Sequence, residues 1–215
     1  MLIVGAKGFA KEVLEVVHQL NELENLVFYD DVSEDVPERL FEKFPVLRCL
    51  EQVDDYFKTV DNRFTIGIGN PVLRKKMYDK FAALGGVFIS TISPLAIIGS
   101  YGVHVGFGNT ILPGAILSNS TELGKGCIIY YNSVITHDCK IGDFVEISPS
   151  ATILGRCLIG SYSQIGANST ILPGVTIGKN VIIGAGSVVT KDVSDNCLVV
   201  GIPAIIKKEL TSLEF

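Results

Sequence analysis

Cysteine pairs, histidines and charged residues are all scarce in this sequence. Its five cysteines, Cys49, Cys127, Cys139, Cys157 and Cys197, form no CxxC pair, which argues against a disulfide framework or a zinc knuckle. Charged residues make up only 19% of the 215 positions, whereas apolar residues make up 47%. That balance argues against a disordered chain and allows a sizeable core.

The charge and the distribution of apolar residues exclude further classes of protein. A net charge of -5 provides no basic surface for nucleic acid. No apolar run reaches the length of about 18 residues that a membrane-spanning helix needs. Because no basic stretch precedes the apolar residues at the N-terminus, no signal peptide is predicted. We expect a cytoplasmic protein with neither a nucleic-acid nor a membrane partner.

What the sequence does contain is a repeat of six residues. From Val105 to Val189 every sixth residue is Ile, Leu or Val, without a break over 15 consecutive hexads. The fifth residue of nearly every hexad is small or β-branched, and the second is often glycine. A period of six fits neither an α-helix nor an amphipathic strand. It predicts a solenoid in which each hexad forms one side of a triangular coil around an aliphatic interior.

Three details of the repeat can be predicted as well. We expect the second-position glycines to relieve the turn between sides by adopting positive φ. The cysteines at fifth positions, Cys127, Cys139 and Cys157, should point into the coil as small apolar residues. Two earlier hexads, which begin at Ile92 and Ile98, are out of phase with the others by one residue. We interpret this shift as a one-residue bulge at a corner.

The first 89 residues follow a different pattern, in which strands and helices alternate. Strands are predicted at 2–4, 26–29, 64–68 and 87–89. One helix should follow Gly5–Ala10, and another should run from Pro71, capped by Asn70, to about Leu84. Residues 32–60 are predicted to be mostly loop, with a short helix near 52–57. The fold class is therefore an α/β Rossmann-like unit over 1–89, followed by an all-β parallel β-helix over 90–215 with a short C-terminal cap.

Three short polar or glycine-rich segments follow the strands of the first unit. Gly5–Ala10 precedes a helix, whose N-terminal N–H groups can bind a phosphate, although its GxxGxA spacing is a reduced form of the dinucleotide fingerprint. Asp30 and Asp31 end the second strand, and Gly67–Asn70 end the third. Each segment alone is also compatible with an ordinary turn. Because the carboxyl ends of parallel strands meet at one edge, we expect the three segments to form one nucleotide site.

One of the three histidines is a candidate catalytic residue. His18 is expected on the surface of the first helix, and His104 lies at the register bulge. His137 is the third residue of its hexad and should project outward from the coil. An imidazole there can act as a general base at neutral pH. An exposed histidine without a role is the alternative.

Several segments carry a resemblance that extends over nearly the whole chain. They are GAKGFAKEV, FYDD and IGIGNPVLRKK in the first unit, and NSVITHDCKIGDFVEISPSATILG with the later hexads and GIPA in the second. They resemble hexapeptide acetyltransferases of the sialic acid O-acetyltransferase-like family, which includes bacterial N-acetyltransferases of nucleotide-linked 4-amino-sugars. The resemblance implies a left-handed β-helix, acetyl-CoA as the acetyl donor, and a homotrimer with active sites between subunits.

The resemblance also implies roles for individual residues. His137 matches the general base, and Asp138 matches the acid that raises its basicity, where a known member has glutamate. The nucleotide-sugar site matches Lys7, Gly8, Phe9, Asp30, Asp31, Gly69 and Asn70. The contacts with acetyl-CoA match Glu146, Ala167 and Ala185, the two alanines through backbone atoms.

Two departures from the family pattern concern the same region. Glu146 occupies a position that is often histidine in the family, so a carboxylate is expected beside the cofactor. Tyr130 and Tyr131 replace more usual small polar residues shortly before the catalytic motif. We expect the two tyrosines to alter the acceptor pocket.

The sequence therefore predicts an acetyl-CoA-dependent N-acetyltransferase that acts on the amine of a nucleotide-linked amino-sugar, such as a UDP-4-amino-4,6-dideoxy sugar, in surface glycan biosynthesis. O-acetylation of sialic acid or another sugar hydroxyl is the nearest alternative. A hexapeptide protein that binds a nucleotide-sugar without catalysis is an alternative of another class. Some hexapeptide β-helices are γ-type carbonic anhydrases that hold zinc with three histidines, but the predicted β-helix has only His104 and His137, so no metal site is predicted.

Overall fold

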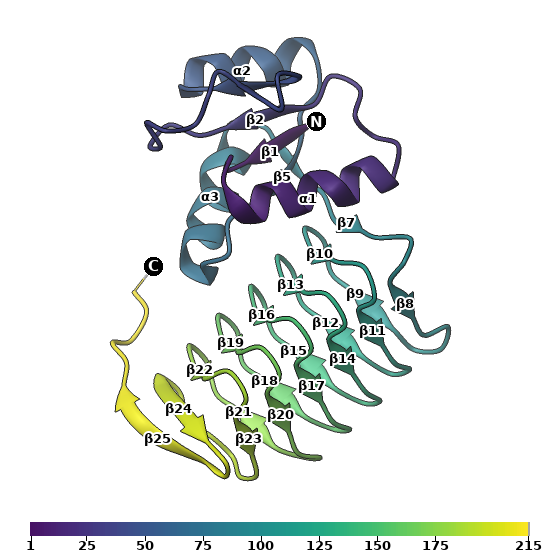
Figure 1. The fold of residues 1–215 in the computed structure, drawn as a ribbon, viewed down its shortest axis with the longest axis vertical. Coiled ribbons are helices and arrows are strands. Elements are labelled where there is room, and N and C mark those ends of the chain that lie inside the picture. Colours follow the sequence, from purple (N-terminus) through teal and green to yellow (C-terminus); the bar gives the residue numbers. More distant parts are fainter. Residues whose placement is uncertain (215) are drawn as a thin grey trace. The chain divides into compact units, whose positions relative to one another are not determined.

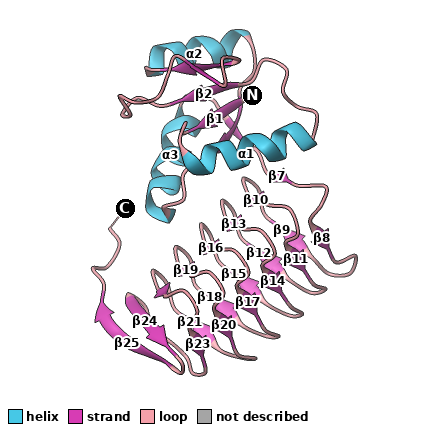
Figure 2. Cartoon of the chain, viewed as in Figure 1, coloured by secondary structure: helices cyan, strands magenta, loops and turns pink. Residues whose placement is uncertain are grey.

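The computed structural model describes residues 1–214, and the chain divides into two compact units, Met1–Ser93 and Pro94–Phe215 (Figure 1). The first unit also contains β7 (Thr91–Ile92). All helices belong to the first unit, while the second consists of short strands joined by turns (Figure 2). Within residues 1–214, no helix is long and apolar enough to cross a membrane.

A six-stranded sheet forms the centre of the first unit. Its strands are β1 (Leu2–Val4), β2 (Val27–Tyr29), β3 (Arg39–Leu40), β4 (Phe44–Leu47), β5 (Arg63–Ile66) and β6 (Val87–Phe88). Their order is β3-β4-β2-β1-β5-β6, and every neighbouring pair is parallel except β3 with β4. β1 and β2 are buried along their whole length, as expected where both faces of a parallel sheet are covered.

Three helices accompany this sheet, and their positions follow from local sequence signals. α1 (Gly8–Gln19) buries Val13, Leu14 and Val17 in one core with Phe28 of β2, as the spacing of its apolar residues predicts. α2 (Leu50–Thr59) is longer than the short helix predicted near 52–57. α3 (Pro71–Ala83) begins as predicted, because the Asn70 side chain accepts the N–H of Leu73 at 3.0 Å.

Residues 32–60, which are predicted to be mostly loop with a short helix near 52–57, also contain two strands. β3 and β4 form an antiparallel hairpin, and β4 then pairs in parallel with β2. The hairpin turn places Phe41 and Glu42 at positive φ (52° and 57°), which is the backbone of a type I′ turn. Neither residue is a usual signal for such a turn, and Pro45 argues locally against a strand. The sequence pattern therefore does not predict this hairpin.

The second unit is a left-handed parallel β-helix, which confirms the predicted fold class. Its two-residue strands are β8 (Ile97–Ile98), β9 (His104–Val105), β10 (Thr110–Ile111), β11 (Ile116–Leu117), β12 (Glu122–Leu123), β13 (Ile128–Ile129), β14 (Val134–Ile135), β15 (Lys140–Ile141), β16 (Glu146–Ile147), β17 (Thr152–Ile153), β18 (Leu158–Ile159), β19 (Gln164–Ile165), β20 (Thr170–Ile171), β21 (Thr176–Ile177), β22 (Ile182–Ile183) and β23 (Val188–Val189). Every third strand belongs to the same sheet, so the three sides of the coil stack into three parallel sheets.

The hexads fill the interior of the coil as predicted. In the 15 in-phase hexads from Val105, the aliphatic first residue is buried everywhere except at Val105, where it is half-buried, and every fifth residue is buried. Cys127, Cys139 and Cys157 are among these buried residues. Ile98 pairs with Leu117, whereas Val105 pairs with Leu123. The connection between β8 and β9 therefore holds one extra residue, which confirms the predicted bulge.

The second-position glycines have a different role from the one predicted. Positive φ occurs at the fourth position, often in other residues, as at Asn132 (55°) and Asn168 (56°). A Cβ on Gly160 would lie 2.4 Å from the carbonyl carbon of Gly178, one coil further on. Contacts this short show that the second-position glycines are required by the close approach of neighbouring coils, and not by an unusual backbone conformation.

The β-helix ends in an antiparallel hairpin of β24 (Cys197–Gly201) and β25 (Ala204–Glu209). β24 pairs in parallel with β22 and so continues one of the three sheets. This hairpin is the predicted short C-terminal cap. β24 and β25 cover the edge of β22, so that β22 is not an exposed edge strand at the end of the β-helix.

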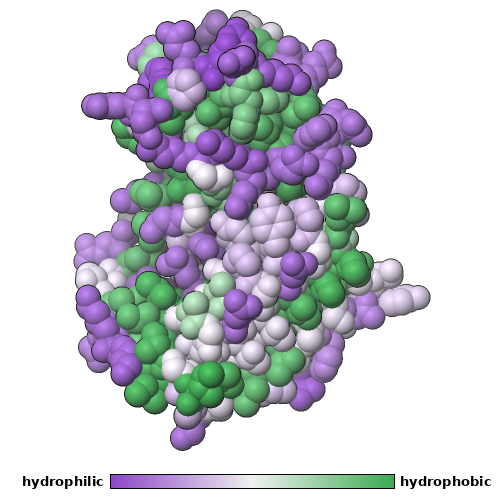
Figure 3. Space-filling view, in the orientation of Figure 1, coloured by the Kyte–Doolittle hydropathy of each residue, from purple (hydrophilic) through white to green (hydrophobic). Residues whose placement is uncertain are grey.

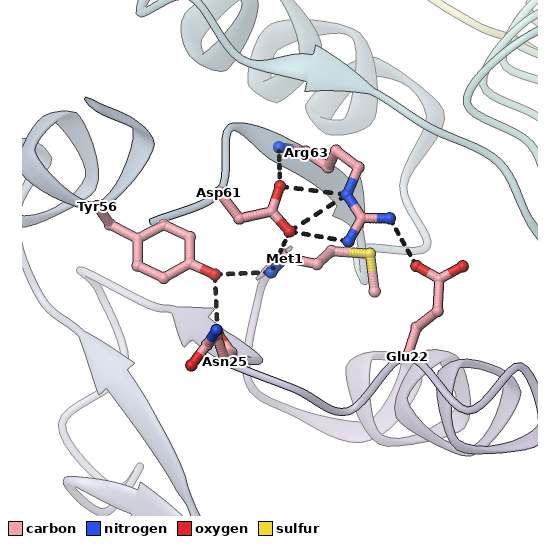
Figure 4. A network of polar contacts seen from close by, with 6 residues as sticks. All are labelled: Met1, Glu22, Asn25, Tyr56, Asp61 and Arg63. Carbon is pink, nitrogen blue, oxygen red and sulfur yellow. Dashed lines mark hydrogen bonds and ion pairs between the residues drawn. The ribbon is translucent and has the colours of Figure 1, made fainter. Parts of the chain in front are cut away.

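A polar network surrounds the N-terminal ammonium group of the first unit (Figure 4). The ammonium donates to Tyr56 Oη at 2.6 Å and pairs with Asp61 Oδ2 at 3.0 Å. Arg63 binds Asp61 at 2.9 Å and Glu22 at 2.7 Å. Burial raises the pKa of Asp61, but hydrogen bonds from Arg63 and from the ammonium outweigh it and hold the pKa well below its usual range.

We expect Asp61→Asn to lower the free energy of unfolding of the first unit by about 2 kcal/mol at neutral pH, because it removes the charge that balances Arg63 and the buried ammonium. Since the folded-state pKa of Asp61 is depressed, its stabilisation is complete above the unfolded-state pKa of about 4 and is lost as the pH falls below it. Urea unfolding of both proteins over a pH series measures the difference. Asp54→Asn, which breaks only the exposed pair with Lys58, should change stability by less than about 0.5 kcal/mol; equal effects of the two substitutions contradict the prediction.

Candidate active site

A pocket of about 480 Å³ lies at the carboxyl ends of β1, β2 and β5. The three segments predicted to form a nucleotide site meet in it, since its lining includes Lys7, Gly8, Phe9, Asp30, Asp31 and Gly69. α1 begins at this edge, so the N-terminal N–H groups of a helix are available to an anion there. The arrangement provides a place for a phosphate beside carboxylates that can accept hydrogen bonds from a sugar or a base.

Two glycines allow the turn before α1 to pack closely against the end of β5. Gly5 has φ of +100°, and a Cβ there would lie 2.9 Å from the carbonyl oxygen of Gly67. A Cβ on Gly67 would lie 2.5 Å from Cα of Ala10, in the first turn of α1. The first turn of α1 therefore approaches the strand end more closely than side chains would permit, and this brings the Gly5–Ala10 segment to the rim of the pocket.

The two aspartates after β2 have different environments. Asp30 is buried, and its Oδ1 accepts the backbone N–H groups of Val32 at 3.2 Å and Ser33 at 2.9 Å, so one oxygen orders the loop that follows. Asp31 is more exposed and accepts the Tyr29 hydroxyl at 2.7 Å, with Lys80 at 3.4 Å. Burial raises the pKa of Asp31, but the hydrogen bond from Tyr29 and the charge of Lys80 outweigh it, so the pKa is lowered and the group is a charged acceptor.

Two other predicted binding residues have partners within the protein. Lys7 Nζ lies 2.7 Å from Asp35 Oδ1, in an exposed ion pair between the turn before α1 and the loop after β2. Asn70 does not line the pocket; its side-chain oxygen caps α3, next to the lining residue Gly69. Because exposed ion pairs contribute little stability, Lys7 can exchange Asp35 for a ligand phosphate at small cost.

His137 and Asp138 lie on the turn after β14, on the outside of the coil. His137 Nδ1 is 2.7 Å from Asp138 Oδ2, and both side chains are about half exposed. Asp138 has φ of 61°, a conformation that aspartate tolerates better than most residues. The aspartate therefore reaches the ring although it is shorter than glutamate. Within residues 1–214, no hydrogen-bond partner is found for Nε2, which leaves this nitrogen available to a substrate.

Gly155 supports the ring of His137 and was not predicted. It occupies the same position as His137 one coil further on, where Arg156 N–H donates to the carbonyl oxygen of His137 at 3.0 Å. A Cβ on Gly155 would lie 2.5 Å from Cε1 and 2.7 Å from Nε2 of the imidazole. The ring thus lies directly over the buried glycine. The repeat itself contains the signal, because residues that are one coil apart are neighbours.

The residues predicted to contact acetyl-CoA share one edge of the β-helix. Glu146 begins β16, and Ala167 and Ala185 follow β19 and β22, which are neighbouring strands of the same sheet. The N–H groups of the two alanines donate to no other residue in the part of the chain that the structure describes. They can therefore bind the amide groups of a pantetheine arm, so the backbone at this edge fits the cofactor.

One chain holds the two groups of predicted site residues apart. β14, the strand that precedes His137, belongs to a different sheet from β16, β19 and β22. The turn with Tyr130 and Tyr131 follows β13, so these tyrosines lie on the edge of Ala167 and not beside His137. Nearness in sequence to His137 is thus a poor guide to their place. Among residues 1–214, no group of three or more His, Cys, Asp or Glu residues could hold a metal ion.

Comparisons with known proteins assign the two units to two families of domain. A family described as the PglD N-terminal domain matches residues 1–81. A family described as bacterial transferase hexapeptide (six repeats) matches residues 120–155, 138–172 and 156–191. No curated protein matches the chain by sequence.

Several solved structures are similar to the chain over almost their whole length. A His-to-Asn variant of perosamine N-acetyltransferase from Caulobacter crescentus, in complex with CoA and GDP-perosamine, has 28% identity and a TM-score of 0.90, over 97% of this chain and 96% of that chain. The acetyltransferase domain of PglB from Neisseria gonorrhoeae FA1090 has 29% identity and a TM-score of 0.87, over 96% and 98%. WeeI from Acinetobacter baumannii AYE has 30% identity and a TM-score of 0.74, over 96% and 98%.

An α/β unit with a nucleotide-sized pocket, followed by a hexapeptide β-helix with an exposed His–Asp pair, defines a two-domain hexapeptide transferase. More narrowly, the chain belongs to the sialic acid O-acetyltransferase-like family of hexapeptide acetyltransferases, and its first unit matches the PglD N-terminal domain. The resemblance seen in the sequence is thereby confirmed.

We expect Gly155→Ala to lower kcat for acetyl transfer about 100-fold, because the new methyl group displaces the imidazole of His137 by a sizeable fraction of an ångström. Steady-state rates of CoA release, corrected for the folded fraction, measure the effect. Gly160→Ala is the matched control, since its Cβ meets the backbone of Gly178 and Lys179 and not the imidazole; it should lower stability and leave kcat within about twofold. If both variants retain the wild-type kcat, the ring does not depend on Gly155.

Proposed function

We propose that this protein transfers the acetyl group of acetyl-CoA to the amino group of a nucleotide-linked amino-sugar. The observation that carries the proposal is the contact of 2.7 Å between His137 Nδ1 and Asp138 Oδ2, which leaves Nε2 as a base on the outside of the coil. The similar perosamine N-acetyltransferase binds CoA and GDP-perosamine, and the PglB domain binds acetyl coenzyme A. The pocket of the first unit supplies a site for the nucleotide part of the acceptor.

The proposed reaction is a direct transfer between two bound substrates. The neutral sugar amine attacks the thioester carbonyl carbon, a C–N bond forms, and Nε2 of His137 takes a proton from the amine. The C–S bond then breaks, the imidazolium returns its proton to the sulfur, and CoA leaves as the thiol. Asp138 accepts the Nδ1–H hydrogen bond, which holds the required tautomer and stabilises the imidazolium. The interior cysteines Cys127, Cys139 and Cys157 are buried, so no cysteine of the interior serves as a nucleophile.

The donor is proposed to bind along the edge that Glu146, Ala167 and Ala185 share. The unpaired N–H groups of the two alanines support contacts with the pantetheine arm. Glu146 Oε1 accepts the Ser148 hydroxyl at 3.3 Å, and its strand β16 pairs with β19, the strand that precedes Ala167. We propose that Glu146 accepts a hydrogen bond from the cofactor where a histidine is frequent in the family.

We also propose a homotrimer in which each active site lies between two chains. His137 and the donor edge belong to different sheets of one β-helix, so a second copy offers the simplest way to bring a base to the thioester. The β-helix exposes large apolar side chains such as Ile97 (60%), Phe107 (49%) and Leu158 (44%). The face shown in Figure 3 carries broad pale and hydrophobic areas over this unit, as expected for a surface that other chains cover.

The finer assignments follow the same proposal. We propose that residues 1–89 bind the nucleotide-sugar and residues 90–215 carry out the transfer. A UDP-4-amino-4,6-dideoxy sugar that is destined for surface glycans is the proposed acceptor, and the cytoplasm, where acetyl-CoA and nucleotide-sugars are made, is the proposed location. The carboxylates of Asp30 and Asp31 at the pocket support an acceptor with N–H or O–H donors in its base or ribose.

We expect turnover with acetyl-CoA and one amino-sugar nucleotide, and its loss in His137→Ala by about 100-fold or more, because the variant has no group to take the amine proton. A thiol-release assay with UDP-, dTDP- and GDP-linked 4-amino-sugars, and with sialic acid, measures it. Turnover on sialic acid alone shows O-acetylation instead. Binding of nucleotide-sugars without turnover shows a non-catalytic protein, and turnover that survives in His137→Ala removes His137 as the base.

Substitutions of Asp138 separate its charge from its shape. We expect Asp138→Asn to lower kcat about 100-fold, because an amide cannot stabilise the imidazolium and can favour the wrong tautomer. Asp138→Glu, which restores the carboxylate, should retain kcat within about threefold. The same assay with saturating substrates compares the three proteins. Equal activity of the Asn and Glu variants indicates that the charge at this position is unimportant.

A further inference from the structure

The loop between β2 and β3 forms one wall of the nucleotide pocket. Asp30, Asp31, Val32 and Ser33 of this loop line the pocket. Further along the loop, Asp35 pairs with Lys7 from the turn before α1, and Val36 is buried. The loop has almost no regular secondary structure, so something other than a strand or helix ladder must hold its shape.

A single side chain from outside the loop binds four of its carbonyl groups. Arg48 Nη1 donates to the carbonyl oxygens of Asp30 at 2.9 Å and Ser33 at 3.1 Å. Arg48 Nη2 donates to the carbonyl oxygens of Val36 and, at 3.5 Å, Pro37. Carbonyl dipoles that point toward one place repel each other unless a donor or cation lies between them. The conformation of the loop therefore depends on the guanidinium.

Arg48 itself is anchored in regular structure. It follows β4, which pairs in parallel with β2, and Asp30 N–H donates to the carbonyl oxygen of Leu47 at 3.1 Å. The backbone N–H of Arg48 donates to Gln52 Oε1 at 2.6 Å, at the start of α2. Arg48 thus connects the loop to the sheet and to α2, the two regular elements that hold its backbone.

The chemistry of the contact requires arginine. A guanidinium presents five N–H donors in a rigid plane, and two of its nitrogens can each serve two carbonyl groups. A lysine at this position keeps the charge but has a single nitrogen at the end of a flexible chain, so it can satisfy only part of the set. Arg48 does not line the pocket, and so its effect on a ligand passes through the loop.

We propose that Arg48 is a positioning residue for the nucleotide part of the acceptor: by binding the loop carbonyls it holds Asp31 and Ser33 at the pocket. The inference rests on the proposed function, because it takes a nucleotide-sugar to be the ligand of this pocket. It predicts a residue that sets the affinity for the acceptor without taking part in the chemistry at His137.

The test compares Arg48→Ala and Arg48→Lys with the wild-type protein. For Arg48→Ala, KM for the amino-sugar nucleotide should rise about tenfold or more, as expected when hydrogen bonds to a charged group no longer order the site. Its kcat and its KM for acetyl-CoA should stay within about twofold, and Arg48→Lys should fall between Arg48→Ala and the wild type. Arg39→Ala is the matched control, because Arg39 ends the same loop and its guanidinium binds only the Lys43 carbonyl oxygen, at 3.2 Å, among the described contacts; it should behave as the wild type.

Calorimetric titration with UDP, dTDP and GDP separates this inference from the proposed function. If the wild type turns over no amino-sugar nucleotide, the proposed function fails, and weaker nucleotide binding in Arg48→Ala still supports the role of Arg48. The inference is overturned if Arg48→Ala leaves both KM for the amino-sugar nucleotide and nucleotide binding unchanged. It is also overturned if the variant lowers kcat instead of raising that KM, or if the wild type binds no nucleotide. If Arg48→Ala does not fold, Arg48→Lys decides by the same criteria.

Discussion

The backbone hydrogen bonds between successive coils are the interaction on which the β-helix and its proposed catalytic pair, His137 and Asp138, depend. Each coil repeats the register of the one before it, as when Val134 pairs with Thr152 and Thr152 with Thr170. This register stacks the aliphatic residues into one buried column and brings neighbouring backbones close enough to require glycine, as at Gly160. It also places the His137 ring over Gly155, so the geometry of the proposed base is a consequence of the coil stacking.

The first unit positions its functional groups in another way. Its parallel strands end at a common edge, where loops with little internal structure carry the polar residues. Side chains then hold these loops: Asp30 binds the backbone just after β2, and Arg48 binds the carbonyl groups further along. The β-helix thus fixes its site through a repeated backbone pattern, whereas the α/β unit relies on individual polar side chains.

The parts that could be predicted are those in which the pattern repeats or the signal is local. The hexads are predictable because every interior position recurs with the same residue types. The start of α3 is predictable because Asn70 and Pro71 are a local signal. The β3–β4 hairpin is not predicted because Phe41 and Glu42 adopt a turn conformation with positive φ that is unusual for their residue types. The role of the second-position glycines was misjudged because the close contact is with another coil.

The sequence by itself determined the β-helix, the α/β unit before it, the residues that fill the coil, and the candidate pair His137 and Asp138, since these follow from periodicity and from the chemistry of single residue types. Only the tertiary structure decided that Asp138 reaches the ring, that Gly155 supports it, that Arg48 holds the pocket loop, and that Tyr130 and Tyr131 lie on another edge of the coil. The contact of Asp138 with its neighbour depends on the backbone conformation at Asp138, and the others depend on residues distant in the chain or turned to different sides of the coil. The order of residue types along the chain does not fix the distances between these side chains in the folded protein.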